Sequence, residues 1–384
     1  MTLRVRAVAS RSRRRVVPAV WVAALVLLAA VGVARTAAAS RPPAGRRVTV
    51  AVFGDSVVES LLVANFLHRG LVPQLSRALW SLGFAPGGVG LIPATTTRWH
   101  FGAVTKLGAR SIPADSWVPI GVAYLPSDDG LSGYSAEAFS PLATATVVVN
   151  DPDVEILYTS SSAPCTFDVT SAGRTWMIDT YRHGPAIDTG TSITLPPGRH
   201  ELTIHGPQCD LLLFDGVIAQ RPVQPGQVQV EVDDLGHSAG FPSSHLGPRV
   251  QQALIDQRYD ISVFLFGYVG EEVDGRWSLY VGGLTARAQI ARKHGGACLI
   301  VQPAPAMVSE SAVAMVSRLE RAVARRAGCT YTTVLAHLWS SAAAAMRRGL
   351  VFADGIHPTA AGYELIVHAL TPVVAQMVRD HVHP

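Results

Sequence analysis

The stretch Val48-Thr-Val-Ala-Val-Phe-Gly-Asp-Ser56 decides the fold class, because a short run rich in β-branched residues ends in glycine, aspartate and serine. Leucines then recur at helical spacing over 71–79, and Gly83 is typical of a helix end. The pattern predicts a strand, a turn and a helix. Ser56 then lies at the carboxyl end of the strand, the edge where open α/β sheets place their sites.

The same rhythm resumes after Pro225 and continues to the C-terminus. Further strands are predicted at Val228–Val232, Ile261–Phe266, Ala297–Val301 and Cys329–Val334, with helices near 244–257, 279–294 and 309–327 and a final helix from about Ala360. Together with Val48–Phe53 this gives five strands separated by helices. Such alternation favours a parallel, doubly wound sheet.

Between 85 and 226 the helical periodicity is absent. Residues 85–130 are rich in Gly, Pro and Trp without a clear period, and we expect a long loop region packed on the core. Short strand-like pieces follow at 145–149, 154–158, 175–179, 192–195, 200–204 and 211–214. This spacing predicts an antiparallel β-sandwich, inserted between the first helix and the second strand of the sheet.

The first 47 residues are predicted to be a targeting segment and linker. An arginine-rich start precedes Val16–Ala34, a run of 19 uncharged residues that is just long enough to span a bilayer. The positive-inside bias places everything after Arg35 outside the membrane. Small residues over 36–40 also resemble a signal-peptidase site. A cleaved signal peptide and a retained membrane anchor both stay open, and either makes the protein extracytoplasmic.

The positive charge belongs to this leader. Ten arginines and no acidic residue precede Val48, so removing them from the formal net charge of +4 leaves the rest of the chain at about −6. Nucleic-acid binding requires basic patches on the folded part. We therefore expect no nucleic-acid partner, and we expect a monomer.

Four cysteines in an exported chain favour pairing. Cys165 and Cys209 lie in the strand-rich segment, whereas Cys298 and Cys329 each open a predicted parallel strand. We predict the disulfides Cys165–Cys209 and Cys298–Cys329, with four buried free thiols as the alternative. No CxxC or close Cys/His cluster is present, so no metal site is expected.

Asp354-Gly-Ile-His-Pro-Thr359 carries the second catalytic pattern. An aspartate three residues before His357 allows the carboxylate to hold one imidazole nitrogen while the other faces a nucleophile. Pro358 disfavours helical geometry at His357 and suits the first turn of the following helix. A capping role without catalysis is the alternative for this segment.

These two motifs resemble those of the GDSL, or SGNH, hydrolase family, over about 50–84 and 227–384. The resemblance implies a flavodoxin-like five-stranded parallel sheet with the sandwich as an insertion, and no cofactor. It implies Ser56 as nucleophile, His357 as general base and Asp354 as its orienting partner. The amides of Ser56 and Gly236 are the implied oxyanion donors.

The third block departs from the family pattern. Where the family has Gly-x-Asn-Asp, this chain reads Gly267-Tyr-Val-Gly270, and Val269 cannot donate a hydrogen bond. Losing one such donor typically costs on the order of 100-fold to 1000-fold in turnover. A substitute donor is expected from the Gly270 amide or from Tyr268. A slow enzyme and an inactive relative both stay open.

The inserted segment resembles carbohydrate-binding-like sandwiches of family members that act on acetylated cell-wall sugars. Trp176 and Tyr181 are candidates for stacking on sugar rings, with core packing as the alternative for Trp176. Near the cleft, Asp55, Trp99 and Tyr268 are the candidate substrate-binding residues.

The leading hypothesis is hydrolysis of a small acyl ester, most plausibly O-acetyl on a glycan, through an acyl-serine intermediate and without a metal or organic cofactor. Acetyl transfer to a sugar hydroxyl, a lipase-like activity and non-catalytic glycan binding in the cell envelope remain as alternatives.

Overall fold

The computed structural model describes residues 44–60, 62–63, 69–94, 100–101, 117–120, 135–236, 242–243, 246–267 and 276–383. The predicted leader, apart from Ala44 to Arg47, lies outside this part of the chain. Ala44–Pro384 form one compact unit. Its first strand begins at Arg46, two residues earlier than the sequence predicts.

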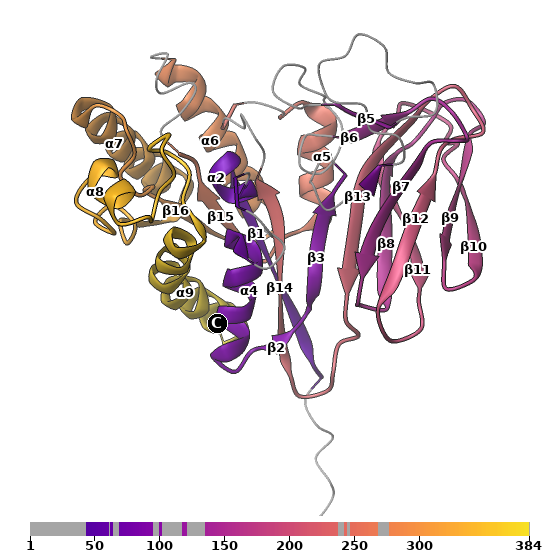
Figure 1. Cartoon of the computed structure of the whole chain (residues 1–384), viewed down its shortest axis with the longest axis horizontal. Helices are drawn as coiled ribbons and strands as arrows, with labels where there is room; N and C mark the ends of the chain where they lie inside the picture. Colours follow the sequence, from indigo (N-terminus) through magenta and orange to yellow (C-terminus); the bar gives the residue numbers. More distant parts are fainter. Residues whose placement is uncertain are drawn as a thin grey trace, which may run out of the picture. The chain divides into compact units, whose positions relative to one another are not determined.

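A parallel sheet forms the α/β part of the molecule (Figure 1). Its strands are β1 (Arg46–Gly54), β14 (Val228–Gly236), β15 (Ile261–Leu265), β16 (Ala297–Val301) and β17 (Thr330–Thr332), in the order β17-β16-β15-β1-β14. All neighbouring pairs are parallel, as predicted. A two-residue strand, β2 (Ala85–Pro86), extends the sheet beyond β14, so the described sheet has six strands rather than the expected five.

Helices cover both faces of this sheet. On one face lie α4 (Leu71–Ser81) and α9 (Ala360–Val382); on the other lie α5 (Pro248–Gln257), α6 (Trp277–Arg292) and α7 (Glu310–Ala327). Alternate residues of β1 serve the two faces, because Val50 and Val52 pack in the core under α4 and α9, whereas Ala51 and Phe53 pack in the core under the other helices. Two short helices, α2 (Ser56–Glu59) and α8 (Ala342–Arg347), complete this part.

Capping residues set the ends of the long helices. Ser309 accepts a hydrogen bond from the amide of Ala312 at the start of α7, and Gly328 ends that helix in the left-handed conformation. Thr359 caps α9 in the same way, and Tyr363 is buried one turn later.

The parallel strand order and the helices on both faces of the sheet confirm the predicted mixed α/β architecture.

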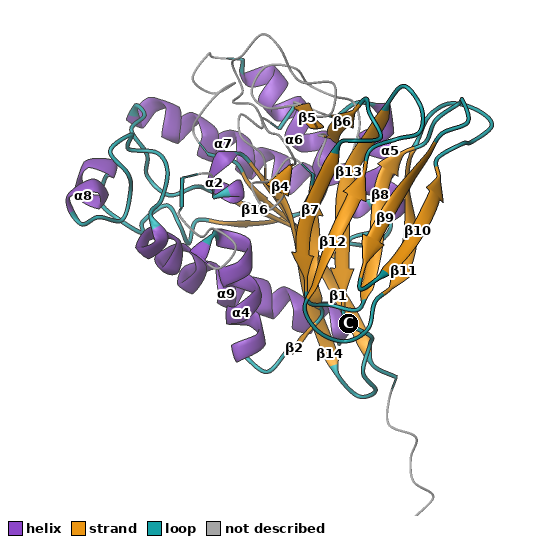
Figure 2. Cartoon of the chain, turned by 45° about the vertical axis from the view of Figure 1, so that its right-hand side comes forward, coloured by secondary structure: helices purple, strands orange, loops and turns teal. Residues whose placement is uncertain are grey.

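The segment between α4 and β14 forms antiparallel sheets, as predicted (Figure 2). One sheet has the order β10-β9-β12-β7-β4 and the other β11-β8-β13-β6-β5, built from β4 (His100–Phe101), β5 (Trp117–Ile120), β6 (Ser135–Ala138), β7 (Thr144–Val149), β8 (Asp153–Thr159), β9 (Thr166–Ser171), β10 (Arg174–Asp179), β11 (Asp188–Thr194), β12 (His200–His205) and β13 (Leu212–Gln220). Alternate residues of both sheets, such as Phe167 and Phe214, are buried in one core between them.

The prediction of a loop region after Ala85 is partly wrong. Strand β3 (Gly88–Pro93) lies there and pairs antiparallel with β13. It also packs on β14, and the absence of a side chain at Gly90 makes this possible. A Cβ at Gly90 would lie 2.2 Å from Oδ1 of Asp233. Strand β3 thus joins the sandwich to the parallel sheet, and its glycines obscured the strand pattern in the sequence.

Buried acidic groups lie at this junction. Asp233 accepts hydrogen bonds from the amide of Leu91 and the hydroxyl of Tyr259, both at 2.8 Å. Glu231, fully buried two residues earlier on β14, accepts from the amide group of Gln220 at 2.9 Å. Burial, followed by the nearby charge of Asp233, raises the pKa of Glu231 well above its ordinary value.

Both predicted disulfides are present. Cys165 and Cys209 join the sandwich strands with Cα atoms 5.2 Å apart, and Cys298 joins Cys329 with Cα atoms 4.8 Å apart. The second pair forms because β16 and β17 are parallel neighbours in which Leu299 lies opposite Thr330, so the preceding residues, Cys298 and Cys329, lie level. Two disulfides are typical of an extracytoplasmic protein.

Among the residues that the structure describes, α9 is long and apolar enough to cross a membrane by length and composition alone. Half of its most apolar window is buried, and Ile366, Leu370 and Val374 lie in the core with α4. These contacts are those of a core helix.

Candidate active site

Ser56 begins α2 immediately after β1 ends, at the carboxyl edge of the sheet. Tight packing holds this short helix against the neighbouring strand ends, because a Cβ at Gly54 would meet Val58 and the carbonyl of Leu265 at 2.2 Å. A Cβ at Gly236 would lie 2.5 Å from the amide of Glu59. Glycine at both positions lets the helix that carries Ser56 lie directly on the ends of β1 and β14.

His357 lies in the loop that precedes α9, and backbone hydrogen bonds fix this loop. The amide of Phe352 donates to the carbonyl of His357 at 2.9 Å, and the amide of Thr359 donates to Leu350 at 2.9 Å. Gly355 has φ = 71°, a left-handed turn that favours glycine, between Asp354 and His357. The turn brings both side chains to one side of the loop.

The structure brings Ser56, His357 and Asp354 together in one chain of hydrogen bonds. Oγ of Ser56 lies 2.7 Å from Nε2 of His357, although the two residues are 301 positions apart in the sequence. Nδ1 of the same imidazole lies 2.8 Å from Oδ2 of Asp354. A carboxylate only accepts, so Nδ1 carries the proton and Nε2 accepts from the serine hydroxyl. This is the arrangement that activates a serine nucleophile.

Asp354 is held as a carboxylate. Partial burial acts to raise its pKa, but the amides of Ile356 and His357 donate to Oδ1 at 2.8 and 3.0 Å, and the imidazole donates to Oδ2. On balance the pKa of Asp354 is lowered. The group that orients His357 therefore remains ionised well into the acidic range.

Asp55 does not have its predicted place in a substrate site. It is 1% exposed, and both carboxylate oxygens accept backbone amides, from Val57 at 2.8 Å and from Gly267 at 2.6 Å. The side chain caps α2 and ties it to the end of β15. Burial outweighs these hydrogen bonds and raises the pKa of Asp55.

Of the predicted oxyanion donors, Ser56 and Gly236 lie within the described residues. The amide of Gly236 already donates to Oδ1 of Asp234 at 3.0 Å, which removes it as a free donor. The amide of Gly267 is likewise engaged by Asp55. Ser56, as the first residue of α2, has an amide without an intrahelical acceptor, so it keeps its candidate role. Tyr268, Val269, Gly270 and the candidate substrate residue Trp99 lie outside the described residues.

An apolar pocket adjoins the residues next to Ser56 and His357. Its volume is about 30 Å³, and Val57, Ile356, Pro358, Leu335 and Trp339 belong to its lining. The other lining residues are Leu265, Gly267, Pro303, Ala304, Ala306 and Ile366.

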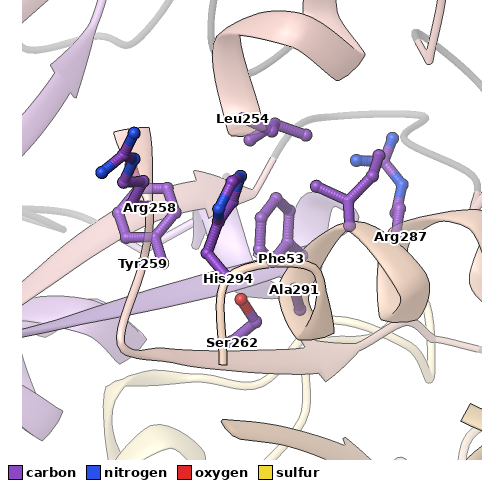
Figure 3. Close-up of a pocket in the computed structure, with 9 residues that line it drawn as sticks. Phe53, Leu254, Arg258, Tyr259, Ser262, Arg287, Ala291 and His294 are labelled. Atoms are coloured by element: carbon purple, nitrogen blue, oxygen red, sulfur yellow. The ribbon is translucent and has the colours of Figure 1, made fainter. Parts of the chain in front are cut away.

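A second, smaller cavity of about 10 Å³ lies between α5, α6 and the sheet (Figure 3). Phe53, Ser262 and His294 line it, together with Arg258 at the end of α5. The two helices run back against the strands, so their C-terminal ends lie at the amino edge of the sheet. Neither Ser56 nor His357 lines this cavity, which belongs to the face of the sheet that α5, α6 and α7 cover.

The two aromatic candidates of the sandwich differ. Trp176 packs against the sandwich core, with the guanidinium of Arg174 at 5.7 Å from its ring centre, as its core-packing alternative predicts. Tyr181 is 38% exposed and its hydroxyl lies 2.9 Å from Nδ1 of His183.

Within the described residues, no group of three His, Cys, Asp or Glu side chains is arranged to hold a metal.

No family model matches the chain, and no curated protein matches it. Among solved structures, a family two carbohydrate esterase from Cellvibrio japonicus is 10% identical over 76% of this chain and 98% of that chain, with a TM-score of 0.29. A salicylyl acyltransferase from a tetracycline biosynthetic pathway is 14% identical over 75% and 97%, with a TM-score of 0.34. A putative SGNH hydrolase from Slackia heliotrinireducens is 19% identical over 38% and 85%, with a TM-score of 0.31.

The chain is similar to SGNH hydrolases. At these TM-scores the likenesses carry no argument about reaction or substrate. The chemical case depends on Ser56, His357 and Asp354.

Proposed function

We propose that this protein is a serine-dependent ester hydrolase that removes short acyl groups, O-acetyl above all, from glycans outside the cytoplasm. The observation that carries the proposal is the pair of hydrogen bonds that join the side chain of Ser56 to that of His357 and the side chain of His357 to that of Asp354. The strand order supports a flavodoxin-like SGNH hydrolase fold, since β14-β1-β15-β16-β17 corresponds to the order 2-1-3-4-5.

The reaction then proceeds in two halves. Oγ of Ser56 attacks the ester carbonyl carbon while Nε2 of His357 takes the hydroxyl proton, and the amide of Ser56 donates to the developing oxyanion. The carbon–oxygen bond to the sugar breaks, and the imidazolium returns its proton to the departing sugar oxygen. Water, deprotonated by the same nitrogen, then attacks the acyl carbon; the bond from that carbon to Oγ breaks, the imidazolium returns the proton to Oγ of Ser56, and acetate leaves.

The apolar pocket supports a short acyl group. Its lining residues Val57 and Ile356 directly follow and precede the two reacting residues, and its described volume is about 30 Å³. The apolar side chains of this lining suit the methyl group of an acetyl ester.

The test is hydrolysis of p-nitrophenyl acetate by the purified chain, beside Ser56→Ala and His357→Ala. Matched controls are Ser81→Ala and His368→Ala, which change exposed residues of α4 and α9. We expect the first two variants to lose activity and the controls to keep it. Equal rates in all five proteins would refute a catalytic role of Ser56.

Two alternatives share this site or its neighbourhood. Acetyl transfer differs from hydrolysis only in the acceptor, so acetate release and acetylated sugar are measured in one reaction with an acetylated donor and a free glycan. Non-catalytic glycan binding is supported by a polar cleft of about 420 Å³ between β8, β11 and α5, lined in part by Glu155, Arg182 and Thr189. Covalent labelling of Ser56 by an active-site phosphonate argues against that alternative; glycan binding without labelling supports it.

The sequence of residues 1–43, which precede the compact unit, supports a location outside the cytoplasm. Together with the two disulfides, their arginine-rich, apolar pattern favours a secreted or membrane-anchored enzyme.

A further inference from the structure

The helix that carries Ser56 cannot satisfy its own carbonyl groups. Helix α2 has four residues, and among the described residues its C-terminal cap Ser60 donates its amide to the carbonyl of Ser56 and its hydroxyl to the carbonyl of Val58. The carbonyl of Val57, the next residue, accepts instead from the hydroxyl of Tyr363 at 2.6 Å. A side chain from another helix therefore completes the hydrogen bonding of the nucleophile segment.

Tyr363 lies on the same element as His357. It is the fourth residue of α9, and its amide donates to Thr359, the cap that follows His357 and Pro358. Packing fixes this first turn closely, because a Cβ at Gly362 would lie 2.0 Å from the carbonyl of Leu350. The histidine loop and Tyr363 thus move together.

The Tyr363 side chain is suited to this contact. It is completely buried in the core with α4, which leaves the ring no freedom to turn away. Burial, with the charges of Asp55 and Asp234, raises the pKa of Tyr363, so the hydroxyl stays protonated and remains a donor.

We propose that Tyr363 is a positioning residue, whose hydrogen bond to the carbonyl of Val57 sets the distance between Ser56 and His357. The proposal rests on the proposed function, since it concerns the same serine and histidine. The Ser56 to His357 hydrogen bond joins chain segments 301 residues apart, and Tyr363 ties these two segments together a few ångströms behind the reacting atoms. Misplacement by about 1 Å can cost on the order of 100-fold in rate.

The test is Tyr363→Phe in the full chain, which removes one oxygen and keeps the buried ring. We expect kcat for p-nitrophenyl acetate to fall about 10-fold to 100-fold while KM changes less than about twofold, because substrate contacts are untouched. The crystal structure of the variant should show Oγ of Ser56 beyond hydrogen-bond distance from Nε2 of His357.

The matched control is Tyr259→Phe. This buried tyrosine also donates one hydrogen bond, to Asp233 at 2.8 Å, but it precedes β15 at the opposite edge of the sheet. A comparable fall in thermal stability for both variants, with a fall in kcat for Tyr363→Phe alone, supports positioning. Equal kcat in both variants overturns it.

The two proposals fail separately. If the unaltered chain cleaves no ester while its structure keeps the Ser56 to His357 contact, the proposed function is wrong. The crystal structure of Tyr363→Phe then decides the positioning role alone: a longer Ser56 to His357 distance supports it, and an unchanged 2.7 Å overturns it.

Discussion

Replacing Asp354 by asparagine separates the orienting role of the carboxylate from its structural role. Oδ1 of Asp354 accepts the amides of Ile356 and His357, and an asparagine oxygen can keep both bonds. At Oδ2, which lies 2.8 Å from Nδ1 of His357, the variant presents an NH₂ donor instead. Nδ1 must then accept, and the proton moves to Nε2, where it faces Ser56. The imidazole can no longer take the serine proton.

This tautomer change predicts a fall in kcat of about 10⁴-fold, the size seen when a triad carboxylate is converted to its amide in serine proteases. In free energy this is about 5.5 kcal/mol of lost transition-state stabilisation. Because the loop bonds persist, thermal stability should change little. Asp354→Ala, which removes the loop bonds as well, should lose both activity and stability.

The assay is p-nitrophenyl acetate hydrolysis at saturating substrate, with thermal unfolding measured on the same preparations. Asp380→Asn, an exposed aspartate on α9, is the matched control. If Asp354→Asn retains more than about a tenth of the wild-type kcat, the carboxylate does not fix the tautomer of His357, and the reasoning from the 2.8 Å contact is wrong.

Three further predictions concern stability and specificity. Replacing Cys298 and Cys329 together by alanine opens a link across 31 residues and should lower the free energy of unfolding by about 3–4 kcal/mol in urea titrations; a loss below about 1 kcal/mol contradicts it. Because the pKa of Glu231 is raised in the fold, its stabilising contribution is complete below the ordinary value of 4.5 and is lost as pH rises through the raised pKa. Glu231→Gln should therefore flatten the decline of Tm with rising pH above about 4.5, whereas Glu201→Gln, an exposed change, should leave the slope as it is; an unchanged slope in Glu231→Gln excludes this carboxyl as the cause. Leu335→Ala enlarges the apolar pocket and should raise the ratio of butyrate to acetate hydrolysis while costing about 2–5 kcal/mol of stability; an unchanged ratio shows that the pocket does not hold the acyl group.

Patterns repeated over many residues made the fold predictable from the sequence. The central strands of the parallel sheet are short apolar runs, and α4 and α7 have apolar residues at helical spacing. The pairing of Cys298 with Cys329 follows once β16 and β17 are neighbours. Strand β3 was missed because its side chains alternate with glycines, whose role becomes clear only when Asp233 approaches Gly90 from β14.

The residues of the candidate site also fall into two groups, those that a local motif identifies and those whose role depends on a distant part of the chain. Ser56, Asp354 and His357 were predictable because each lies in a short motif whose local turn already fixes the side chain. The roles of Asp55, Gly236 and Tyr363 depend on atoms that the fold brings from elsewhere, namely the amide of Gly267, the carboxylate of Asp234 and the carbonyl of Val57. The spacing of residues in the sequence carries no signal for these contacts. The sequence does show a tyrosine, Tyr363, four residues after the helix cap Thr359, but it does not show which group the hydroxyl contacts.

The pairing of β1 with β14 bears on how the chain folds. These strands match along nine residues, yet roughly 170 residues separate them in the sequence. Closing so long an unstructured loop costs about 4–5 kcal/mol of chain entropy and slows the search for the right partner. The folded sandwich removes most of that cost, because hydrogen bonds from Gly87 to Val230 and from Arg221 to Gly87 hold its two ends side by side. Folding of this inserted domain therefore sets the pace at which β1, the strand that leads to Ser56, pairs with β14.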